Sequence, residues 1–487
     1  MIKEKSLKKN YFYNLIYQIF LIIVPILVTP YVARVIGENG IGQYSYTSSI
    51  QSYFSLFAAL GCNYYAQRVI ASHQNNKTQQ IVDLYEIIIA RLIPIMISLV
   101  VYYILIFLNV YQNKYELLMM ILSINIIAIM FDVTFFFQGN EEFGKIVIRN
   151  VIIKIISIMS IFIFVKKYDD LWKYTLIQCL TLLISNLSLW LYFPNMITRV
   201  SLKKINPLKH LRPMLILFLP TIATSIYTSL DKTLIGILTK SDAENGNYEY
   251  AEKLVKMTMT IVTSLGAVMI PRNSKNFAEG KIDKVKENIY NTSKFVLFIG
   301  IPLMFGLMAI ADNLVPWYLG SNGYAKVSHL MKILSPIIVI IGLSNVFGVQ
   351  YLIPSKQDKK FTVAIVIGAC VNFILNLCMI PIMKSEGAAL ATVIAELTIT
   401  IIMAYSIRKE IDVKIIVKSA MNYLFAGIVM FLICSIISDL LNPDICSTFF
   451  CIIIGGIIYS IILILIKDKI ILTLISNIKK RIFTKKG

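Results

Sequence analysis

Residues 419–438 read SAMNYLFAGIVMFLICSIIS and contain no Asp, Glu, Lys or Arg. Residues 446–466 read CSTFFCIIIGGIIYSIILILI and are equally free of charge. A helix needs about 20 apolar residues to cross the hydrocarbon core of a bilayer. Because lipid offers no hydrogen-bond partner to peptide groups, continuous apolar runs of this length form helices there. These two stretches therefore predict two membrane-spanning helices.

The rest of the chain has the same character. Apolar residues make up 57% of its 487 positions and charged residues 15%, well below the roughly 25% of a soluble domain. This composition excludes a soluble enzyme and a disordered chain, and the continuous runs exclude a membrane β-barrel. We predict an all-α polytopic membrane protein with about 14 transmembrane helices. The expected spans are 11–33, 43–64, 87–109, 117–138, 147–165, 174–193, 213–238, 249–271, 295–312, 330–353, 361–383, 386–407, 419–438 and 446–466.

The net charge of +20 is distributed in a way that predicts orientation. The two termini and the even-numbered connections hold 33 of the 47 Lys and Arg residues, whereas the odd-numbered connections hold 8. Cytoplasmic segments carry the excess of basic residues in membrane proteins. We therefore expect both termini to be cytoplasmic and the basic segments to contact anionic lipid headgroups. Nucleic acid is not an expected partner.

The chain also contains an internal repeat. Glu38-Asn39-Gly40 recurs as Glu244-Asn245-Gly246, Leu60-Gly61 recurs as Leu265-Gly266, and Arg68 recurs as Arg272, at offsets of 206, 205 and 204. Six expected helices separate the copies, so both halves have the same orientation. We predict a parallel repeat, an arrangement found in transporters. The expected domains are a six-helix lobe over 1–206, a second over 207–410, and two accessory helices with a basic cytoplasmic tail over 411–487.

Several charged residues lie inside or at the ends of expected helices, where an ionisable group needs a partner or a cavity. The basic ones could hold phosphate or an acidic sugar in a water-filled cavity between the halves, arginine through two parallel hydrogen bonds and lysine as a point charge. Snorkelling to the interface and local ion pairs are the alternative explanations. The basic candidates for substrate contact are Arg34, Arg91, Lys232, Lys253 and Lys256.

The acidic candidates for ion coupling or gating are Asp132, Asp231 and Glu396. Glu396 lies near the middle of its expected helix, with no basic neighbour in that helix. Such a carboxylate could carry a proton, and a neutral structural hydrogen bond is the alternative. The sequence shows no nucleophile, base and orienting group together, no phosphate-binding Gly-Lys-Ser/Thr loop and no cysteine pair with metal-site spacing. We therefore expect no catalytic residue, no metal and no cofactor.

Three stretches, taken together, resemble a known family. TPYVARVIGENGIGQY at 29–44, FDVTFFFQGNEEFGKIVIRN at 131–150, and SLDKTLIGIL at 229–238 followed by ENGNYEYAEKL at 244–254 are similar to signatures of one transporter branch. This is the polysaccharide-transport branch of the multidrug/oligosaccharidyl-lipid/polysaccharide flippases. Phe135 stands where that branch is expected to have tryptophan.

The resemblance implies a Wzx-type flippase rather than an enzyme. Such a protein moves an undecaprenyl-pyrophosphate-linked oligosaccharide across the bacterial inner membrane by alternating access, for O-antigen or capsular polysaccharide. It implies membrane lipid and the lipid-linked oligosaccharide as partners. H⁺ or Na⁺ as coupling ion and the polysaccharide polymerase machinery are further candidate partners. The family fold, two six-helix lobes and two more helices, agrees with the repeat.

Other functions remain open at this point. A lipid II flippase of the same superfamily also carries a pyrophosphate substrate, and a cation-coupled drug antiporter would favour an acidic cavity. From other classes, a membrane-embedded polysaccharide polymerase or acyltransferase and a structural scaffold are alternatives. A polymerase is expected to have a large external loop, and the connections here are short.

Overall fold

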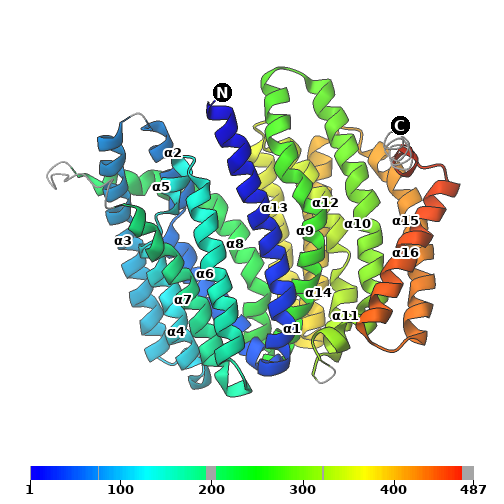
Figure 1. Cartoon of the computed structure of the whole chain (residues 1–487), viewed down its shortest axis with the longest axis horizontal. Coiled ribbons are helices and arrows are strands. Elements are labelled where there is room, and N and C mark those ends of the chain that lie inside the picture. The colour runs from blue at the N-terminus through cyan, green and yellow to red at the C-terminus, as the bar shows by residue number, and fades with distance from the viewer. Residues whose placement is uncertain (1, 75, 194–204, 321–322, 474–475, 477–487) are drawn as a thin grey trace, which may run out of the picture. The chain divides into compact units, whose positions relative to one another are not determined.

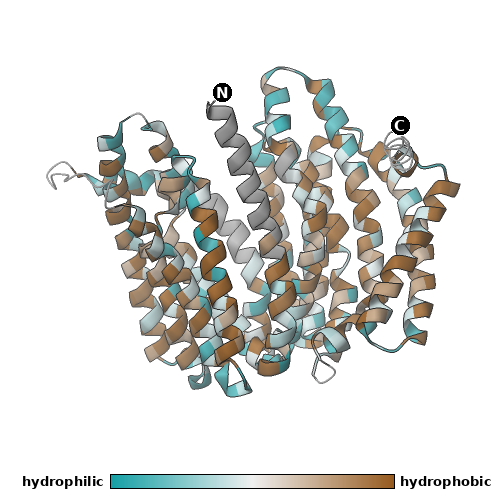
Figure 2. Cartoon of the chain, in the orientation of Figure 1, coloured by the Kyte–Doolittle hydropathy of each residue, from teal (hydrophilic) through white to brown (hydrophobic). Residues whose placement is uncertain are grey.

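The computed structural model describes residues 2–74, 76–193, 205–320, 323–473 and 476. Within these ranges the chain is helical and contains no strand, which confirms the predicted all-α class. Eleven of the described helices are long and apolar enough to cross a membrane. Figure 2 shows hydrophobic residues along the helices and hydrophilic residues gathered toward their ends. The basic tail from 477 onward and the connection 194–204, which contribute to the predicted charge bias, lie outside the described residues.

The chain divides into two compact units, Met1–Gly246 and Asn247–Gly487 (Figure 1). Unit 1 contains α1 (Ile2–Ala59), α2 (Cys62–Ser72), α3 (Lys77–Phe107), η1 (Asn113–Tyr115), α4 (Glu116–Met130), α5 (Thr134–Gly139), α6 (Phe143–Phe164), η2 (Tyr168–Asp170), α7 (Leu171–Leu189), η3 (Trp190–Tyr192), η5 (Pro207–His210), α8 (Leu211–Thr239) and the first turn of α9 (Asp242–Ala278).

Unit 2 contains the rest of α9, α10 (Ile282–Tyr318), α11 (Ala325–Leu334), α12 (Ile337–Ser344), the π-helix η6 (Asn345–Leu352), α13 (Asp358–Met383), α14 (Ser385–Ile407), α15 (Val413–Leu440) and α16 (Ile445–Leu465). The two accessory helices expected from the sequence are α15 and α16, which pack on each other and on α10. The predicted boundaries of the lobes at 206 and 410 stay a prediction, because the division into compact units follows packing and not the repeat.

The helices of unit 1 contain three breaks that the hydropathy does not reveal. The first two spans join in α1, where only Gly37 leaves the helical conformation, with φ 73°. The second span is interrupted again at Leu60 and Gly61, which both have positive φ. The fourth span is broken after Met130, so that α4 and the short α5 are separate helices. Each break changes which side chains face the interior of unit 1.

The connections of unit 1 gather at two opposite ends, as alternating membrane crossings require. At one end, Tyr168 lies beside Gly37 and Gly40, and Lys114 pairs with Asp242. At the other end, Gln74 donates from Nε2 to the Gly139 carbonyl at 2.7 Å. The predicted order of crossings therefore holds within this unit.

The repeated Glu-Asn-Gly stretches pack directly against each other. A Cβ atom added to Gly42 would lie 1.7 Å from the carbonyl oxygen of Asp242, and one added to Gly246 would lie 2.0 Å from that of Glu38. Only residues without a side chain allow α1 and the start of α9 to approach so closely. The glycines of this region therefore fix how α9 begins, in addition to marking the repeat.

Gly42→Ala tests this close approach. The new methyl group would overlap backbone, which cannot rotate away, so we expect the midpoint of thermal unfolding in detergent to fall by roughly 5 °C. Gly456→Ala is the matched control, because nothing lies within 4 Å of a Cβ added at that helical glycine. An unchanged midpoint for Gly42→Ala would show that the two helices do not touch there.

Candidate functional site

The break between α4 and α5 positions the second signature stretch. The Thr134 backbone N–H donates to Asp132 Oδ1 at 2.9 Å, so this carboxylate, one residue before the N-cap Val133, satisfies the first N–H of α5. Asn63 Nδ2 donates to Asp132 Oδ2 at 3.4 Å. Asp132, a predicted coupling residue, is half-buried. Its observed contacts stabilise the turn that leads into α5.

Arg91 reaches the same break from α3. Its NH2 group donates to the backbone carbonyls of Met130, at 3.2 Å, and Asp132, at 2.7 Å. The last carbonyls of a helix have no partner within the helix, and a cationic side chain can satisfy them. The guanidinium carbon also lies 5.7 Å from the ring centroid of Phe135. Arg91 thus connects α3 to the signature stretch at 131–150.

Arg91 is also enclosed, with only 1% of its surface exposed. Among the described residues, no hydrogen-bond acceptor is found for its Nε and NH1 groups and no carboxylate lies at ion-pair distance. Burying an unpaired cation costs several kcal/mol, so the two carbonyls and the ring recover only part of that cost. The geometry of Arg91 accounts for a positioning role, and its predicted contact with substrate stays a prediction.

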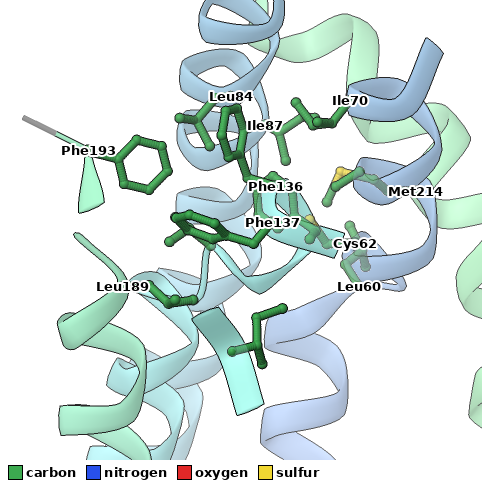
Figure 3. Packing of buried hydrophobic residues seen from close by; sticks show 14 of the residues in the cluster. Leu60, Cys62, Ile70, Leu84, Ile87, Phe136, Phe137, Leu189, Phe193 and Met214 are labelled. Atoms are coloured by element: carbon green, nitrogen blue, oxygen red, sulfur yellow. The ribbon is translucent and has the colours of Figure 1, made fainter. Parts of the chain in front are cut away.

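Aromatic residues of the same stretch form the packed core beside this break. Phe135, Phe136 and Phe137 are buried, and Figure 3 shows Phe136 and Phe137 beside Leu189, the last residue of α7, and Phe193, which follows η3. Cys62, Ile70 and Met214 from α2 and α8 complete the packing. The run of three phenylalanines in the signature is therefore a structural core and does not line an open sugar-binding surface.

The other predicted site residues are distributed over four helices, α1 and α8 of unit 1 and α9 and α14 of unit 2. Arg34 is exposed on α1, three residues before the Gly37 break. Asp231 and Lys232 are consecutive residues of α8; Asp231 is buried and Lys232 is half-buried. The backbone carbonyl of Lys232 accepts a hydrogen bond from Asn245 at 2.7 Å, which links the two parts of the third signature stretch.

Unit 2 holds the remaining three predicted residues. Lys256 forms an ion pair of 2.6 Å with Glu252, one turn earlier in α9. Lys253 and, on α14, Glu396 are half-buried. Of the predicted residues, the structure thus brings Arg91 together with Asp132, through the backbone carbonyl of Asp132. It also pairs Lys256 with Glu252, a pair that the sequence analysis did not predict.

Two polar clusters of unit 1 are absent from the sequence prediction. At the end that contains Gly37, the Asp242 carboxylate accepts from Gln43 at 3.1 Å, Lys114 at 2.9 Å and Tyr115 at 2.6 Å. These groups come from α1, η1 and α9. An acidic residue is favourable at the start of a helix, where the dipole is positive. Asp242 therefore ties three connections of this end together.

At the opposite end, the Glu86 carboxylate is buried and accepts from Lys209 at 2.5 Å, from the Asn206 backbone N–H at 2.8 Å and from His210 Nε2 at 2.9 Å. Ligand atoms of Asp83, Glu86 and His210 lie within 4.8 Å of one another, close enough in principle for a metal ion. The Lys209 ammonium already neutralises Glu86. The observed contacts therefore explain the cluster as an anchor for the start of α8.

The sequence could not reveal these clusters, because the donors to Asp242 and Glu86 lie between 120 and 199 residues away from these carboxylates and no local pattern joins them. A weak signal exists for one of them: Asp83 and Glu86 are acidic residues three apart at the start of an apolar run, on one face of a helix.

Unit 2 has an apolar groove along α10. Its volume is about 360 Å³, and the lining comes from α9, α10, α15 and α16. Ile261, Pro302, Met430 and Ile452 represent the four helices of the almost wholly apolar lining, and open space surrounds a Cβ added at Gly456. Such a groove suits a hydrocarbon chain.

Two polar cavities lie toward the start of α10. One, of about 450 Å³, is lined by Arg272, Lys284 and several asparagines of α9 and α10. The second, of about 610 Å³, lies between α10, α15 and the residues after α16. The two share Asn291 and Phe295 and are therefore neighbours. One helix thus carries an apolar groove and cationic cavities at different heights.

Comparisons with known proteins agree with this architecture. Residues 7–277 match a family model described as polysaccharide biosynthesis protein, and residues 217–378 match the MatE family model. The chain is 22% identical over 409 residues to a putative O-antigen transporter of Escherichia coli, which covers 83% of this chain and 97% of the relative. It is 24% identical over 185 residues to the lipid II flippase MurJ of Bacillus subtilis, 37% of this chain and 34% of that protein.

Solved structures share the fold. A lipid II flippase MurJ in an inward closed conformation superimposes with a TM-score of 0.78 at 16% identity, covering 94% of this chain and all of that one. An inward-facing multidrug MATE transporter gives a TM-score of 0.56 at 13% identity over 85% of this chain and 98% of its own. These likenesses confirm the predicted superfamily fold.

Arg91→Ala separates a positioning role from substrate contact. Loss of two charge-assisted hydrogen bonds would free the carbonyls at the α4–α5 break, so we expect a destabilisation of about 3 kcal/mol, measured by thermal unfolding and by protein level in the membrane. Arg68→Ala, an exposed arginine on α2, is the control. A variant that keeps its stability but loses transport would instead place Arg91 in contact with substrate.

Proposed function

Because the chain belongs to the polysaccharide biosynthesis protein family, we propose that it is a flippase for lipid-linked oligosaccharides. Its substrate is an undecaprenyl-pyrophosphate-linked repeat unit, moved by alternating access across the bacterial inner membrane for O-antigen or capsular polysaccharide. Relatives named as transporters and flippases support transport rather than catalysis. The match to the putative O-antigen transporter covers 97% of that relative, which favours its substrate class over lipid II.

The apolar groove along α10 is the observation that carries the proposal. A pyrophosphate with several sugars cannot cross hydrocarbon unaided, whereas its polyprenyl tail prefers hydrocarbon. A flippase must therefore treat the two ends of one molecule differently. The groove, bounded by α15 and α16, would hold the tail while the head follows a separate cationic path. A carrier of small soluble cations has no need of such a groove.

The head of the substrate would be held by basic side chains. Arg34, Lys232, Lys253 and Lys256 are the proposed contacts, with Arg91 as a further one through its unpaired NH groups. Arginine suits a phosphate through paired hydrogen bonds, and lysine suits it as a mobile point charge. Asp132, Asp231 and Glu396 are the proposed coupling or gating residues, with H⁺ or Na⁺ as the ion.

Deletion of the gene in its native strain tests the proposed function. We expect loss of surface polysaccharide and accumulation of lipid-linked oligosaccharide on the cytoplasmic leaflet, restored by the intact gene but not by Arg34→Ala or Lys232→Ala at equal protein level. Lys240→Ala, an exposed lysine just after α8, is the matched control. Normal polysaccharide with altered sensitivity to cationic drugs would favour an antiporter, and arrested cell-wall synthesis would favour a lipid II flippase.

Gly456→Phe tests the groove. The added ring would enter open space at the groove without a backbone clash, so folding should be retained while the polyprenyl tail is displaced. We expect polysaccharide export to fall at least tenfold at unchanged protein level. Ile453→Phe is the control, because this exposed α16 residue lies outside the groove. Equal export by both variants would show that the groove does not hold the tail.

A further inference from the structure

A second polar site lies in unit 2, away from the predicted substrate residues. It is the cavity of about 610 Å³ between α10, α15 and the turn after α16. Lys294 enters from α10, Ser419 and Asn422 from α15, and Lys467 and Lys469 from the turn. Because the lining combines ammonium, amide and hydroxyl groups, it can both balance a negative charge and donate several hydrogen bonds.

The three lysines of this cavity form no ion pair among the described residues. In the described part of the chain, no carboxylate lies within ion-pair distance of Lys294, Lys467 or Lys469. Asp468 is the acidic residue of the lining, and its oxygens accept hydrogen bonds from two other lining residues. Its Oδ1 accepts from the Ile470 N–H at 2.9 Å, and its Oδ2 accepts from the Tyr423 hydroxyl at 3.0 Å. The cavity therefore has an excess of two positive charges.

The cavity lies where a lipid headgroup would be found. Helices α10 and α15 line both the cavity and the apolar groove, and Pro302 of the groove follows Phe295 of the cavity by seven positions on α10. At 1.5 Å per residue this is a separation of about 10 Å along the helix. Basic pockets between membrane helices bind anionic headgroups in this position. The charge bias of the sequence predicts that this is the cytoplasmic leaflet.

We propose that this cavity binds the phosphate of an anionic membrane phospholipid, with the acyl chains following α15 and α16 toward the apolar groove. The ammonium groups more than offset the single negative charge of the phosphodiester, while Ser419 and Asn422 are suited to hydrogen-bond the glycerol and ester oxygens. A polyprenyl pyrophosphate offers the same phosphate chemistry from a second source. A bilayer phospholipid fits this cavity better than the polyprenyl pyrophosphate does. Its compact headgroup carries one phosphodiester and hydroxyls, and the lining offers amide and hydroxyl groups as hydrogen-bond partners. The inference does not depend on the proposed function.

Native mass spectrometry of the full chain, purified in detergent, tests this site with phosphatidylglycerol, phosphatidylcholine and a polyprenyl pyrophosphate as probes. The site variant carries Lys294→Ala, Lys467→Ala and Lys469→Ala. The charge-matched control carries Lys359→Ala, Lys409→Ala and Lys414→Ala, three exposed lysines outside the cavity. We expect wild type and control to prefer phosphatidylglycerol. The site variant should bind it about tenfold to a hundredfold more weakly, from the loss of three lysines.

A second variant separates charge from folding. Replacing the same three lysines with arginine keeps the charge and should restore phosphatidylglycerol binding, provided that the unfolding midpoint of each variant matches wild type. Equal affinity of the site variant and the control for phosphatidylglycerol would overturn the proposal. So would a site variant that keeps phosphatidylglycerol but loses polyprenyl pyrophosphate, since the cavity would then belong to the substrate.

Discussion

Every peptide group inside a bilayer has to be hydrogen-bonded within the protein, and the rest of this structure depends on that constraint. It makes continuous helices the default and makes each break costly. The break after α4 persists because Arg91 donates to the carbonyls of Met130 and Asp132 while the Asp132 side chain satisfies the first N–H of α5. A buried arginine, expensive by itself, is therefore explained by the backbone that it satisfies.

The same constraint explains why connections of unit 1 carry its polar clusters. Asp242 and Glu86 are each surrounded by donors from several segments, at opposite ends of the helices. Helices packed in lipid gain little from apolar contact with one another, because lipid is equally apolar. Multiple hydrogen bonds at the ends and close backbone approach at Gly42 and Gly246 then determine how the segments of this unit fit together.

In unit 2, helix α10 borders two different kinds of surroundings. Its middle faces an apolar groove, and its first turns face cavities with unpaired lysines. An amphiphile has the same division between tail and head. The proposed task of this protein is to move such a molecule. Separate sites on α10 for the substrate tail and for a membrane lipid would let the bilayer influence the helices that line the groove.

The sequence by itself determined the class of the protein. Uncharged runs such as 419–438 leave helices as the only solution in lipid, and the Glu-Asn-Gly repeat and the signature stretches identified the superfamily fold, which the structural likeness confirms. It did not determine the breaks at Gly37 and after Met130, since their cost is met by residues distant in the chain. Nor did it assign environments: Arg34 is exposed, Arg91 is enclosed and Lys256 pairs with Glu252. Hydropathy is a local property, whereas hydrogen-bond satisfaction and charge pairing depend on which helices meet, and only the tertiary structure decides that.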